Sequence, residues 1–311
     1  MIEISAITKR YGTRVAVDDA TFEVTTGRVT GFVGPNGAGK STTMRMMVGL
    51  SRPDAGEVRY AGTRYTDLSN PARVVGAVLD ARAMHPGRTA RNHLRAAAAL
   101  SNIASTRVDE VLEAVGLTSA GDQRAGGFSL GMRQRLALAG ALLGEPEVLL
   151  LDEPSNGLDP DGIRWLRTYL RDFADQGGTV FVSSHLIAEL AMFADDLVVI
   201  GGGRILAADT VDAITASTEV TVVTETPHTA DLIGLLATHG ISADVEGHRL
   251  RIHGTTRHEI ARLAFDNRIR LDELTETTSS LEDILLDLTN TTAEFASART
   301  TSHPTPGAHA S

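Results

Sequence analysis

The segment Gly34-Pro35-Asn36-Gly37-Ala38-Gly39-Lys40-Ser41 is the most informative part of the sequence. The stretch fits G-x-x-x-x-G-K-[ST], the pattern of a loop that wraps nucleotide phosphates. The apolar run Val29–Val33 before it predicts a buried strand, and Thr42–Leu50 after it predicts a helix. Glycines let backbone N–H groups point at phosphate oxygens, and the helix N-terminus adds partial positive charge. We therefore expect Lys40 to reach the β- and γ-phosphates and Ser41 to hold Mg²⁺; a glycine-rich turn without a ligand is the alternative.

Composition limits the classes of protein that this chain can be. Its 311 residues allow one large domain and a small one, and 42% hydrophobic residues supply a packed core. The formal net charge of -10 argues against broad electrostatic binding to nucleic acid. The chain has no cysteine, which excludes disulfides and thiolate metal sites. It starts in strand-like alternation, so we expect no signal peptide, and no apolar run is long enough to span a bilayer.

Lysine usage supports a phosphate site. Lys9 and Lys40 are the only lysines, and every other basic residue apart from histidine is arginine. The broad planar fork of an arginine does not enter a tight phosphate nest as an ammonium does. A chain that avoids lysine yet has one at this position is consistent with that requirement.

The hydrophobic pattern changes along the chain. Residues 1–28 alternate apolar and polar side chains and predict antiparallel strands with a turn near Tyr11-Gly12. From Val29 onwards, continuous apolar runs predict a parallel sheet covered on both faces. The pattern over 86–122 is mostly helical and predicts an inserted helical subdomain, expected at about 86–145. Further strands are expected at Val148–Leu151, Val180–Val182 and Leu197–Ile200, and a helix at Ile163–Ala174.

A composition shift near residue 215 marks a domain boundary, so we expect a first domain over 1–215. A small α+β domain is expected over 216–289. A tail over 290–311 is rich in Thr, Ser, Ala and Pro, and we expect it to be disordered. A helix at Leu281–Leu288 has one apolar stripe, which fits a core face or a partner site. The other elements expected in the small domain are strands at 219–224, 243–245 and 250–252 and helices at 229–239 and 258–267.

Two carboxylates follow a buried strand. Val148-Leu149-Leu150-Leu151 leads directly into Asp152 and Glu153. Ligands of open α/β sheets bind at the carboxyl ends of the strands. We expect Asp152 to hold Mg²⁺ and Glu153 to polarise the attacking water. The alternative is a buried strand that ends in two solvated acids without a functional role. The presence of a phosphate loop in the same chain makes this alternative less favoured.

The stretch Phe128-Ser129-Leu130-Gly131-Met132-Arg133-Gln134-Arg135 opens an apolar helix that runs to Leu143. We expect Ser129 and the N-terminus of this helix to form an anion site. The alternative is that Ser129 only caps a core helix. Here the chain resembles the ATP-binding cassette (ABC) ATPases, whose signature L-S-G-G-Q continues into R-Q-R or K-Q-R. Leu130 replaces a glycine and Met132 replaces the glutamine, while the matching residues are Ser129, Gly131, Gln134 and Arg135.

This resemblance covers residues 1–215 tightly. It implies an α/β phosphate-loop NTPase cassette with an antiparallel β subdomain, a mostly parallel core sheet and an inserted helical subdomain, followed by the small C-terminal α+β domain. It also implies a homodimer, or a pair with a homologous ATPase, in which two ATP molecules lie between head-to-tail copies. The implied nucleotide-binding residues are Tyr11, Gly34, Pro35, Asn36, Gly37, Ala38, Gly39, Lys40, Ser41, Thr42, Ser129, Gly131 and Asp159.

The resemblance also assigns individual roles. Tyr11 matches the aromatic residue that stacks on adenine, although a tyrosine packing a strand edge is the alternative. Ser129 and Gly131 would contact the γ-phosphate held by the other copy, and Asp159 would help to align the two copies. His185, which follows a predicted strand, would contact the γ-phosphate and orient Glu153 and water. The implied catalytic residues are Glu153, His185 and Lys40.

One position departs from the most familiar family pattern. The family often has a glutamine after the strand at 74–79, where it touches Mg²⁺ and water; this chain has Asp80. A carboxylate still ligates Mg²⁺, so the predicted metal ligands are Ser41, Asp80 and Asp152. The following residues, 81–88, are expected to form a loop facing the transport channel.

The small domain and the signature variant resemble, more loosely, bacitracin, lantibiotic and anthracycline exporter ATPases. This implies an ATPase that powers export of a drug, antibiotic or peptide through a separate multi-span permease, at the cytoplasmic face of the membrane and with no nucleic acid partner. The main alternative is a soluble ABC ATPase acting on ribosomes or DNA, although the chain has one cassette and no zinc module or long coiled coil. Intact Asp152, Glu153 and His185 oppose a regulator without turnover, and the lack of Asn-Lys-x-Asp opposes a GTPase.

Overall fold

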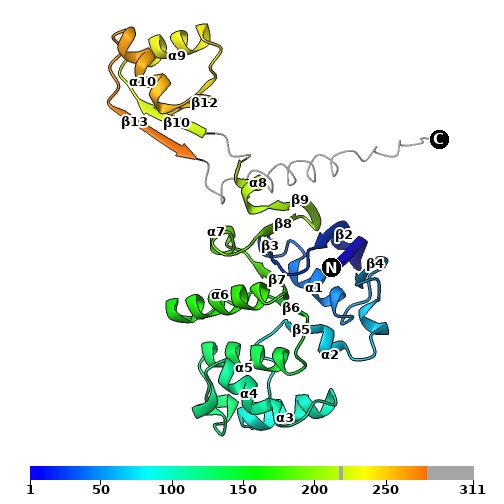
Figure 1. The fold of residues 1–311 in the computed structure, drawn as a ribbon. Helices are drawn as coiled ribbons and strands as arrows, with labels where there is room; N and C mark the ends of the chain where they lie inside the picture. Colours follow the sequence, from blue (N-terminus) through cyan, green and yellow to red (C-terminus); the bar gives the residue numbers. More distant parts are fainter. Residues whose placement is uncertain (217–219, 279–311) are drawn as a thin grey trace, which may run out of the picture. The chain divides into compact units, whose positions relative to one another are not determined.

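The computed structural model describes residues 1–216 and 220–278. It divides into two compact units, of which the first includes Met1–Val211 and the second lies within Asp212–Asp287. Each unit has its own buried apolar core, and both are drawn in Figure 1. None of the helices in the described ranges is long and apolar enough to cross a membrane.

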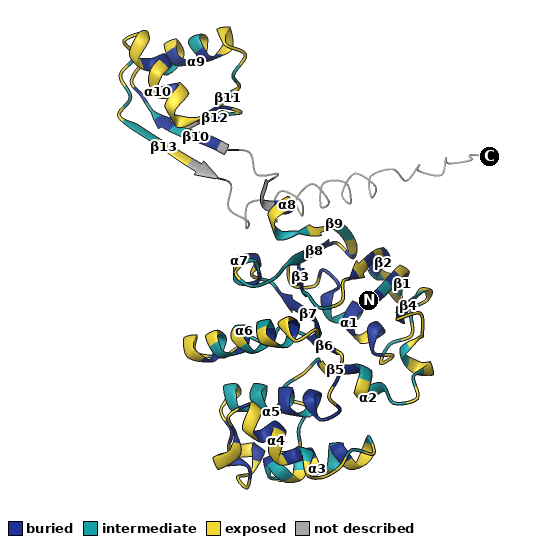
Figure 2. Cartoon of the chain, viewed as in Figure 1, coloured by how far each residue is buried: buried dark blue, intermediate teal, exposed yellow. Residues whose placement is uncertain are grey.

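A six-stranded sheet forms the centre of the first unit, in the order β5-β6-β7-β3-β8-β9. Neighbouring strands from β5 to β8 are parallel, whereas β9 pairs antiparallel with β8. Strands β3, β6 and β7 are buried along their whole length, because helices and the second sheet cover both faces (Figure 2). The strands are β3 (Val29–Val33), β5 (Val75–Val78), β6 (Val148–Leu151), β7 (Thr179–Ser184), β8 (Asp196–Gly201) and β9 (Arg204–Thr210).

A second, antiparallel sheet has the order β2-β1-β4. Its strands are β1 (Ile2–Tyr11), β2 (Arg14–Val24) and β4 (Ala55–Tyr60). The rings of Phe22, Phe32 and Phe181 stack with centroids 5.1 to 5.7 Å apart and join this sheet to the central one. The packing fixes the β1–β2 hairpin relative to β3, the strand that enters the phosphate loop.

Three helices form the inserted helical subdomain: α3 (Ala90–Leu100), α4 (Arg107–Ala114) and α5 (Leu130–Leu142) (Figure 1). Helix α5 lies against β5 so closely that a Cβ on Gly76 would lie 2.3 Å from the carbonyl oxygen of Ala141. Thr89 and Ser129 cap α3 and α5 through their side-chain oxygens. The other helices between residues 1 and 216 are α1 (Lys40–Met47), α2 (Pro71–Val74), α6 (Pro160–Asp175), α7 (Ile187–Ala191) and α8 (Val211–Ala216), with short 3-10 turns η1 (Tyr65–Asp67), η2 (Thr118–Ala120) and η3 (Ala125–Gly127).

The second unit runs β-α-β-β-α-β, with an antiparallel sheet in the order β11-β12-β10-β13. This is the ferredoxin-like arrangement. Both helices bury apolar residues against the sheet, and the core consists of Val222, Leu232, Leu236, Leu250, Ile252 and Ile260. The elements are β10 (Val220–Glu225), α9 (Thr229–Thr238), β11 (Ala243–Glu246), β12 (Arg249–His253), α10 (Arg257–Asp266) and β13 (Glu273–Thr278).

The predicted fold class is confirmed, with differences at particular elements. Helix α1 begins at Lys40 and ends at Met47, earlier at both ends than predicted, because Gly39 (φ 116°) already turns the chain into the helix. The sequence did not predict β4, β9 or β13; β9 contains no buried residue, so its apolar pattern is weak. The helix expected at Leu281–Leu288 and the tail expected at 290–311 lie outside the described residues.

Candidate active site

The phosphate loop joins β3 to α1 and depends on two glycines. Gly39 has a φ of 116°, which favours glycine, and a Cβ there would lie 2.7 Å from the carbonyl oxygen of Ala16. A Cβ on Gly34 would lie 2.2 Å from the carbonyl oxygen of Ile200. The loop therefore rests directly on β2 and β8, and no side chain fits at either position. Its backbone ends at the N-terminus of α1, where the free N–H groups and the helix dipole favour an anion.

Lys40 is buried although it carries a charge, with only 5% of its surface exposed. Its Nζ donates a hydrogen bond to the carbonyl oxygen of Gly34 at 2.6 Å and to that of Pro35 at 3.4 Å. The same Nζ lies 3.2 Å from Oε1 of Glu153. The ammonium is thus satisfied by loop carbonyls and one carboxylate, which is the pairing that a buried cation requires.

Three side chains share the carboxylate of Glu153. Oε1 faces Lys40, while Oε2 accepts hydrogen bonds from Nδ1 of His185 at 2.6 Å and from Nδ2 of Asn156 at 3.0 Å. Because a carboxylate only accepts, His185 carries a proton on Nδ1. Glu153 also has a left-handed backbone, with φ 49°, and its N–H donates to Oγ of Ser183 at 2.9 Å. A non-glycine residue in this conformation persists only where its surroundings hold it.

Burial raises the pKa of Glu153, but the hydrogen bond from His185 and the charge and hydrogen bond of Lys40 outweigh it. Together they hold the pKa of this carboxyl below its ordinary value of 4.5. In this arrangement Glu153 is ionised but is a weak base. Any interaction that draws Lys40 away from Glu153 raises the pKa of the carboxyl and makes it a stronger base.

Asp152 is tied to the same cluster through Ser183. Oγ of Ser183 donates to Oδ1 of Asp152 at 2.6 Å and accepts from the N–H of Glu153. Across the described ranges there is no group of three or more His, Cys, Asp or Glu that could hold a metal ion. Ser41 and Asp152 nevertheless offer hard oxygen ligands of the kind that Mg²⁺ accepts when phosphates and water complete its coordination.

A pocket of about 310 Å³ opens over the phosphate loop. Tyr11 stands at it with 52% of its surface exposed, and Nζ of Lys9 lies 5.7 Å from the centroid of its ring. The pocket brings together eight residues that the sequence predicted. The lining consists of Tyr11, Arg14, Ala16, Asn36, Gly37, Gly39, Lys40, Ser41, Thr42 and Glu153.

Three residues near the pocket were not predicted: Arg14, Asn156 and Ser183. Arg14 follows the β1–β2 turn, and its guanidinium lies 3.6 Å from where a Cβ on Gly37 would stand. It forms no ion pair with any residue in the described ranges. A lone arginine matches no motif, so only the folded hairpin shows that this cation lies beside the phosphate loop.

Ser129, Gly131 and Asp159 do not line the pocket of their own chain. Oγ of Ser129 caps α5 by accepting from the N–H of Met132 at 3.2 Å. Oδ1 of Asp159 caps α6 by accepting from the N–H of Gly162 at 2.8 Å. Their predicted roles across a pair of copies stay predictions.

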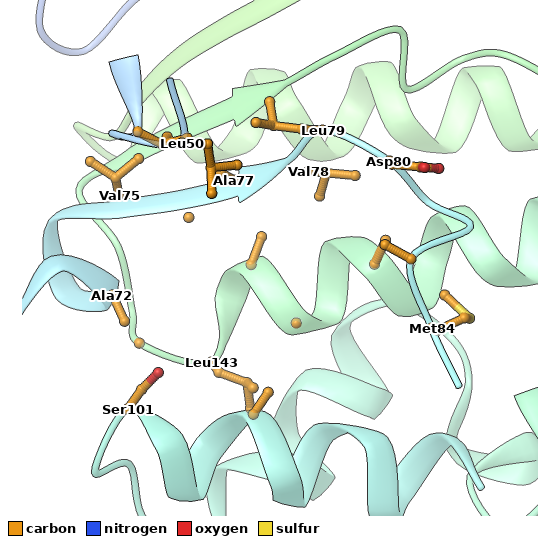
Figure 3. Close-up of a pocket in the computed structure, with 18 of the residues that line it drawn as sticks. Leu50, Ala72, Val75, Ala77, Val78, Leu79, Asp80, Met84, Ser101 and Leu143 are labelled. Atoms are coloured by element: carbon orange, nitrogen blue, oxygen red, sulfur yellow. The ribbon is translucent and has the colours of Figure 1, made fainter. Parts of the chain in front are cut away.

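Asp80 lies two residues beyond the end of β5 and not in the nucleotide pocket. Its Oδ1 accepts a hydrogen bond from the N–H of Arg82 at 2.8 Å. It lines a groove of about 550 Å³ between β5, α3 and α5, with apolar residues such as Leu50, Leu79 and Met84 (Figure 3). Its role as a metal ligand therefore stays a prediction.

The fold and the site define a phosphate-loop nucleoside triphosphatase with a helical insertion. Residues 17–156 match the family model described as ABC transporter, and residues 218–282 match a domain of unknown function, DUF8746. The chain is 33% identical over 297 residues to the uncharacterised ABC transporter ATP-binding protein YhcH of Bacillus subtilis (strain 168), covering 94% of this chain and 97% of that one. The chain belongs to the ABC transporter ATP-binding proteins, and it is an ATPase of that family.

Two further relatives have named roles. The bacitracin transport ATP-binding protein BcrA of Bacillus licheniformis is 33% identical, covering 93% of this chain and 97% of its own length. The daunorubicin resistance ATP-binding protein DrrA3 of Streptomyces coeruleorubidus is 32% identical, covering 93% and 95%.

Solved structures agree on the fold. An ATP-binding subunit of an ABC transporter superimposes with a TM-score of 0.63 at 27% identity, covering 70% of this chain and 92% of its own. A dimeric cassette bound to ADP and Pi has a TM-score of 0.62 at 23% identity, covering 68% and 99%. The second likeness supports the fold alone.

The lowered pKa of Glu153 predicts a pH-dependent contribution to stability. The contribution is present above 4.5, the ordinary pKa of the group, and is lost as the pH falls through the lower pKa of the folded state. Glu153→Gln should therefore be less stable than the parent at neutral pH, and the difference should shrink below pH 4.5. Denaturant unfolding followed by fluorescence of Trp165 measures this difference. Glu113→Gln, an exposed control, should show no such trend, and a pH-independent difference for Glu153→Gln would contradict the assignment.

Proposed function

We propose that this chain is the ATPase subunit of an exporter that moves an antibiotic, drug or peptide through a separate membrane permease. The similarity to BcrA and DrrA3 carries the proposal, because it covers 93% of this chain and so extends into the second unit as well as the cassette. A soluble ATPase acting on ribosomes or DNA is not favoured, because these relatives are named for transport or drug resistance and the net charge is -10.

The nucleotide-binding step follows from the loop. The N–H groups of the phosphate loop and of the first turn of α1 would hold the phosphates of ATP. Ser41 and Asp152 would hold Mg²⁺, which neutralises charge on the phosphates when it is bound. Tyr11 would lie against the adenine, and Arg14 would add a second cation beside the loop.

The pairing of Lys40 with Glu153 supports a simple sequence of events. A triphosphate carries more negative charge than one carboxylate, so Lys40 turns from Glu153 to the phosphates. The pKa of Glu153 then rises, and the carboxylate, oriented by His185 and Asn156, accepts a proton from the attacking water. The water oxygen bonds to the γ-phosphorus as the bond to the β–γ bridging oxygen breaks, which gives ADP and inorganic phosphate.

Two copies would complete each site. Ser129 and Gly131 lie outside the pocket of their own chain, which supports a head-to-tail pair in which they reach the γ-phosphate held by the partner. The N-terminus of α5 supplies the partial positive charge for that contact. Asp159, at the start of α6, would align the two copies. The solved dimeric cassette bound to ADP and Pi gives a precedent for pairing in this fold.

The groove between β5, α3 and α5 is the proposed docking site for the permease. It is lined largely by apolar side chains, and Leu50 at its edge is 73% exposed. A short amphipathic helix from a cytoplasmic loop of the permease would cover this surface. The chain would then be peripheral at the cytoplasmic face of the membrane, where movement of the helical subdomain reaches the permease directly.

Replacing the exposed apolar residue Leu50 at the edge of the groove with a charged one should weaken the binding of the chain to its permease. Leu50→Glu places a charge in the proposed interface, so an affinity-tagged chain expressed in its own cells should no longer co-purify a polytopic permease from detergent extracts. Met192→Glu, at another exposed apolar residue (64% exposed), is the matched control and should retain the permease. ATP affinity should be parental in both variants. A parental chain that co-purifies ribosomes or DNA and no polytopic membrane protein would contradict the proposed function.

Arg14→Ala should weaken the binding of charged nucleotides. Because one exposed charge-assisted contact is lost, we expect about 3- to 10-fold weaker binding of ADP and ATP, with a smaller change for AMP. Equilibrium titration with each nucleotide measures this, and Arg14→Lys should recover part of the affinity. Arg95→Ala, at an exposed arginine of α3, serves as the control. Unchanged ADP affinity would remove Arg14 from the site.

A further inference from the structure

We propose that Gln134 is a positioning residue that ties the signature helix α5 to the base-bearing loop 153–158 of the same copy, with Leu130 as a second contact. The proposal rests on the proposed function, because in a pair of copies the two ends of this connection belong to different nucleotide sites. Ser129, at the N-terminus of α5, would serve the nucleotide of the partner. Glu153 would act on the nucleotide held by its own chain.

The amide of Gln134 makes the central contact. Its Nε2 donates to the carbonyl oxygen of Pro154 at 2.8 Å and approaches that of Glu153 at 3.4 Å. Both partners are carbonyl oxygens, so the nitrogen of the amide has to face them. Oε1 of Gln134 is buried and accepts no hydrogen bond from the residues that the structure describes. The polar role of this side chain is therefore donation to the loop that carries the base.

The base-bearing loop depends on that donation. Glu153 has a left-handed backbone (φ 49°), and Ser183 fixes only its N–H side. On the carbonyl side, the N–H of Asn156 donates to the carbonyl oxygen of Glu153 at 3.2 Å. Gln134 adds a donor to the next carbonyl oxygen, that of the buried Pro154. Removing the donor would leave a buried carbonyl oxygen without this partner and would release one of the restraints on a strained residue. The direction of the Glu153 carboxylate would then be less well defined.

Leu130 adds an apolar contact between the same two segments. A Cβ on Gly157 would lie 2.0 Å from Cδ2 of Leu130, so the leucine side chain occupies the space beside this glycine. One residue further along, a Cβ on Gly131 would lie 3.3 Å from Cδ2 of Leu158. Leu130 stands where the family signature has a glycine, so this contact exists because the chain departs from the signature at this position. It joins the signature turn to the loop that begins at Glu153.

The connection would couple the two nucleotide sites. ATP held by the partner would fix the position of Ser129 at the N-terminus of α5. Through the contacts of Gln134 and Leu130, the fixed helix would then hold the loop that carries Glu153 in place. Because the connection ends at Glu153, the coupling would act on turnover, and it would appear as cooperativity of ATP hydrolysis between the two sites. Its physical basis is the direct contact of α5 with the loop 153–158 through Gln134 and Leu130.

The test compares steady-state turnover of the full chain over a range of MgATP concentrations. Gln134→Met keeps the length of the side chain and removes the donor. We expect kcat to fall by about 10-fold or more and the Hill coefficient to fall toward one, while affinity for a fluorescent non-hydrolysable ATP analogue changes less than about twofold. Leu130→Ala should lower the Hill coefficient with a smaller loss of kcat. Gln123→Met, at an exposed glutamine of the same subdomain, is the control and should behave as the parent.

Two results would overturn the proposal. One is a parental kcat and Hill coefficient in both Gln134→Met and Leu130→Ala. The other is a fall in analogue affinity and in thermal midpoint that matches the fall in kcat, because a merely structural role would produce it. If Gln134→Met does not fold, Leu130→Ala alone decides. A parent protein that turns over ATP as a non-cooperative monomer would contradict the proposed pairing itself, a result that the parent shows before any variant is made.

Discussion

The site depends on the sharing of one carboxylate among three donors. One carboxylate oxygen of Glu153 balances the buried charge of Lys40, and the other accepts hydrogen bonds from His185 and Asn156. This arrangement satisfies a buried cation and at the same time orients the carboxylate that we propose as the base. It also keeps that carboxylate weakly basic, because the partners that satisfy it hold its pKa low. If Lys40 binds a phosphate group instead of Glu153, the pKa of Glu153 rises, and the carboxylate becomes a stronger base only when the nucleotide is bound.

The rest of the cassette holds these groups in register. Stacking of Phe22, Phe32 and Phe181 fixes the hairpin that carries Tyr11 and Arg14 against the central sheet. Parallel pairing of β6 with β7 brings Asp152 and Glu153 to the same edge as Ser183 and His185. Buried strands position the carboxylates, and the helical subdomain provides both the signature and the groove proposed for the permease.

The sequence predicted the parts of the molecule that follow from local pattern. The phosphate loop, the buried strands and the acids after β6 are contiguous motifs, and the structure brings Lys40, Ser41 and Glu153 into one pocket. The sequence predicted no role for Arg14 or Asn156, and it marked Gln134 only as a match to the family signature. Their roles arise from contacts made only in the folded chain, such as that of Gln134 with Pro154, twenty residues away. Strand β9 was missed because it buries no residue and so lacks a clear alternation.

If Lys40 leaves Glu153 for the phosphates of bound ATP, the pKa of Glu153 changes, so this pKa reports the exchange. Selective ¹³C labelling of glutamate side chains, with the Glu153 signal assigned by its loss in Glu153→Gln, allows an NMR titration of the full chain with and without a non-hydrolysable ATP analogue and Mg²⁺. We expect a pKa of Glu153 below 4.5 without nucleotide and a higher pKa with it. An equal or lower pKa in the nucleotide-bound protein would show that Lys40 does not leave Glu153 for the phosphates.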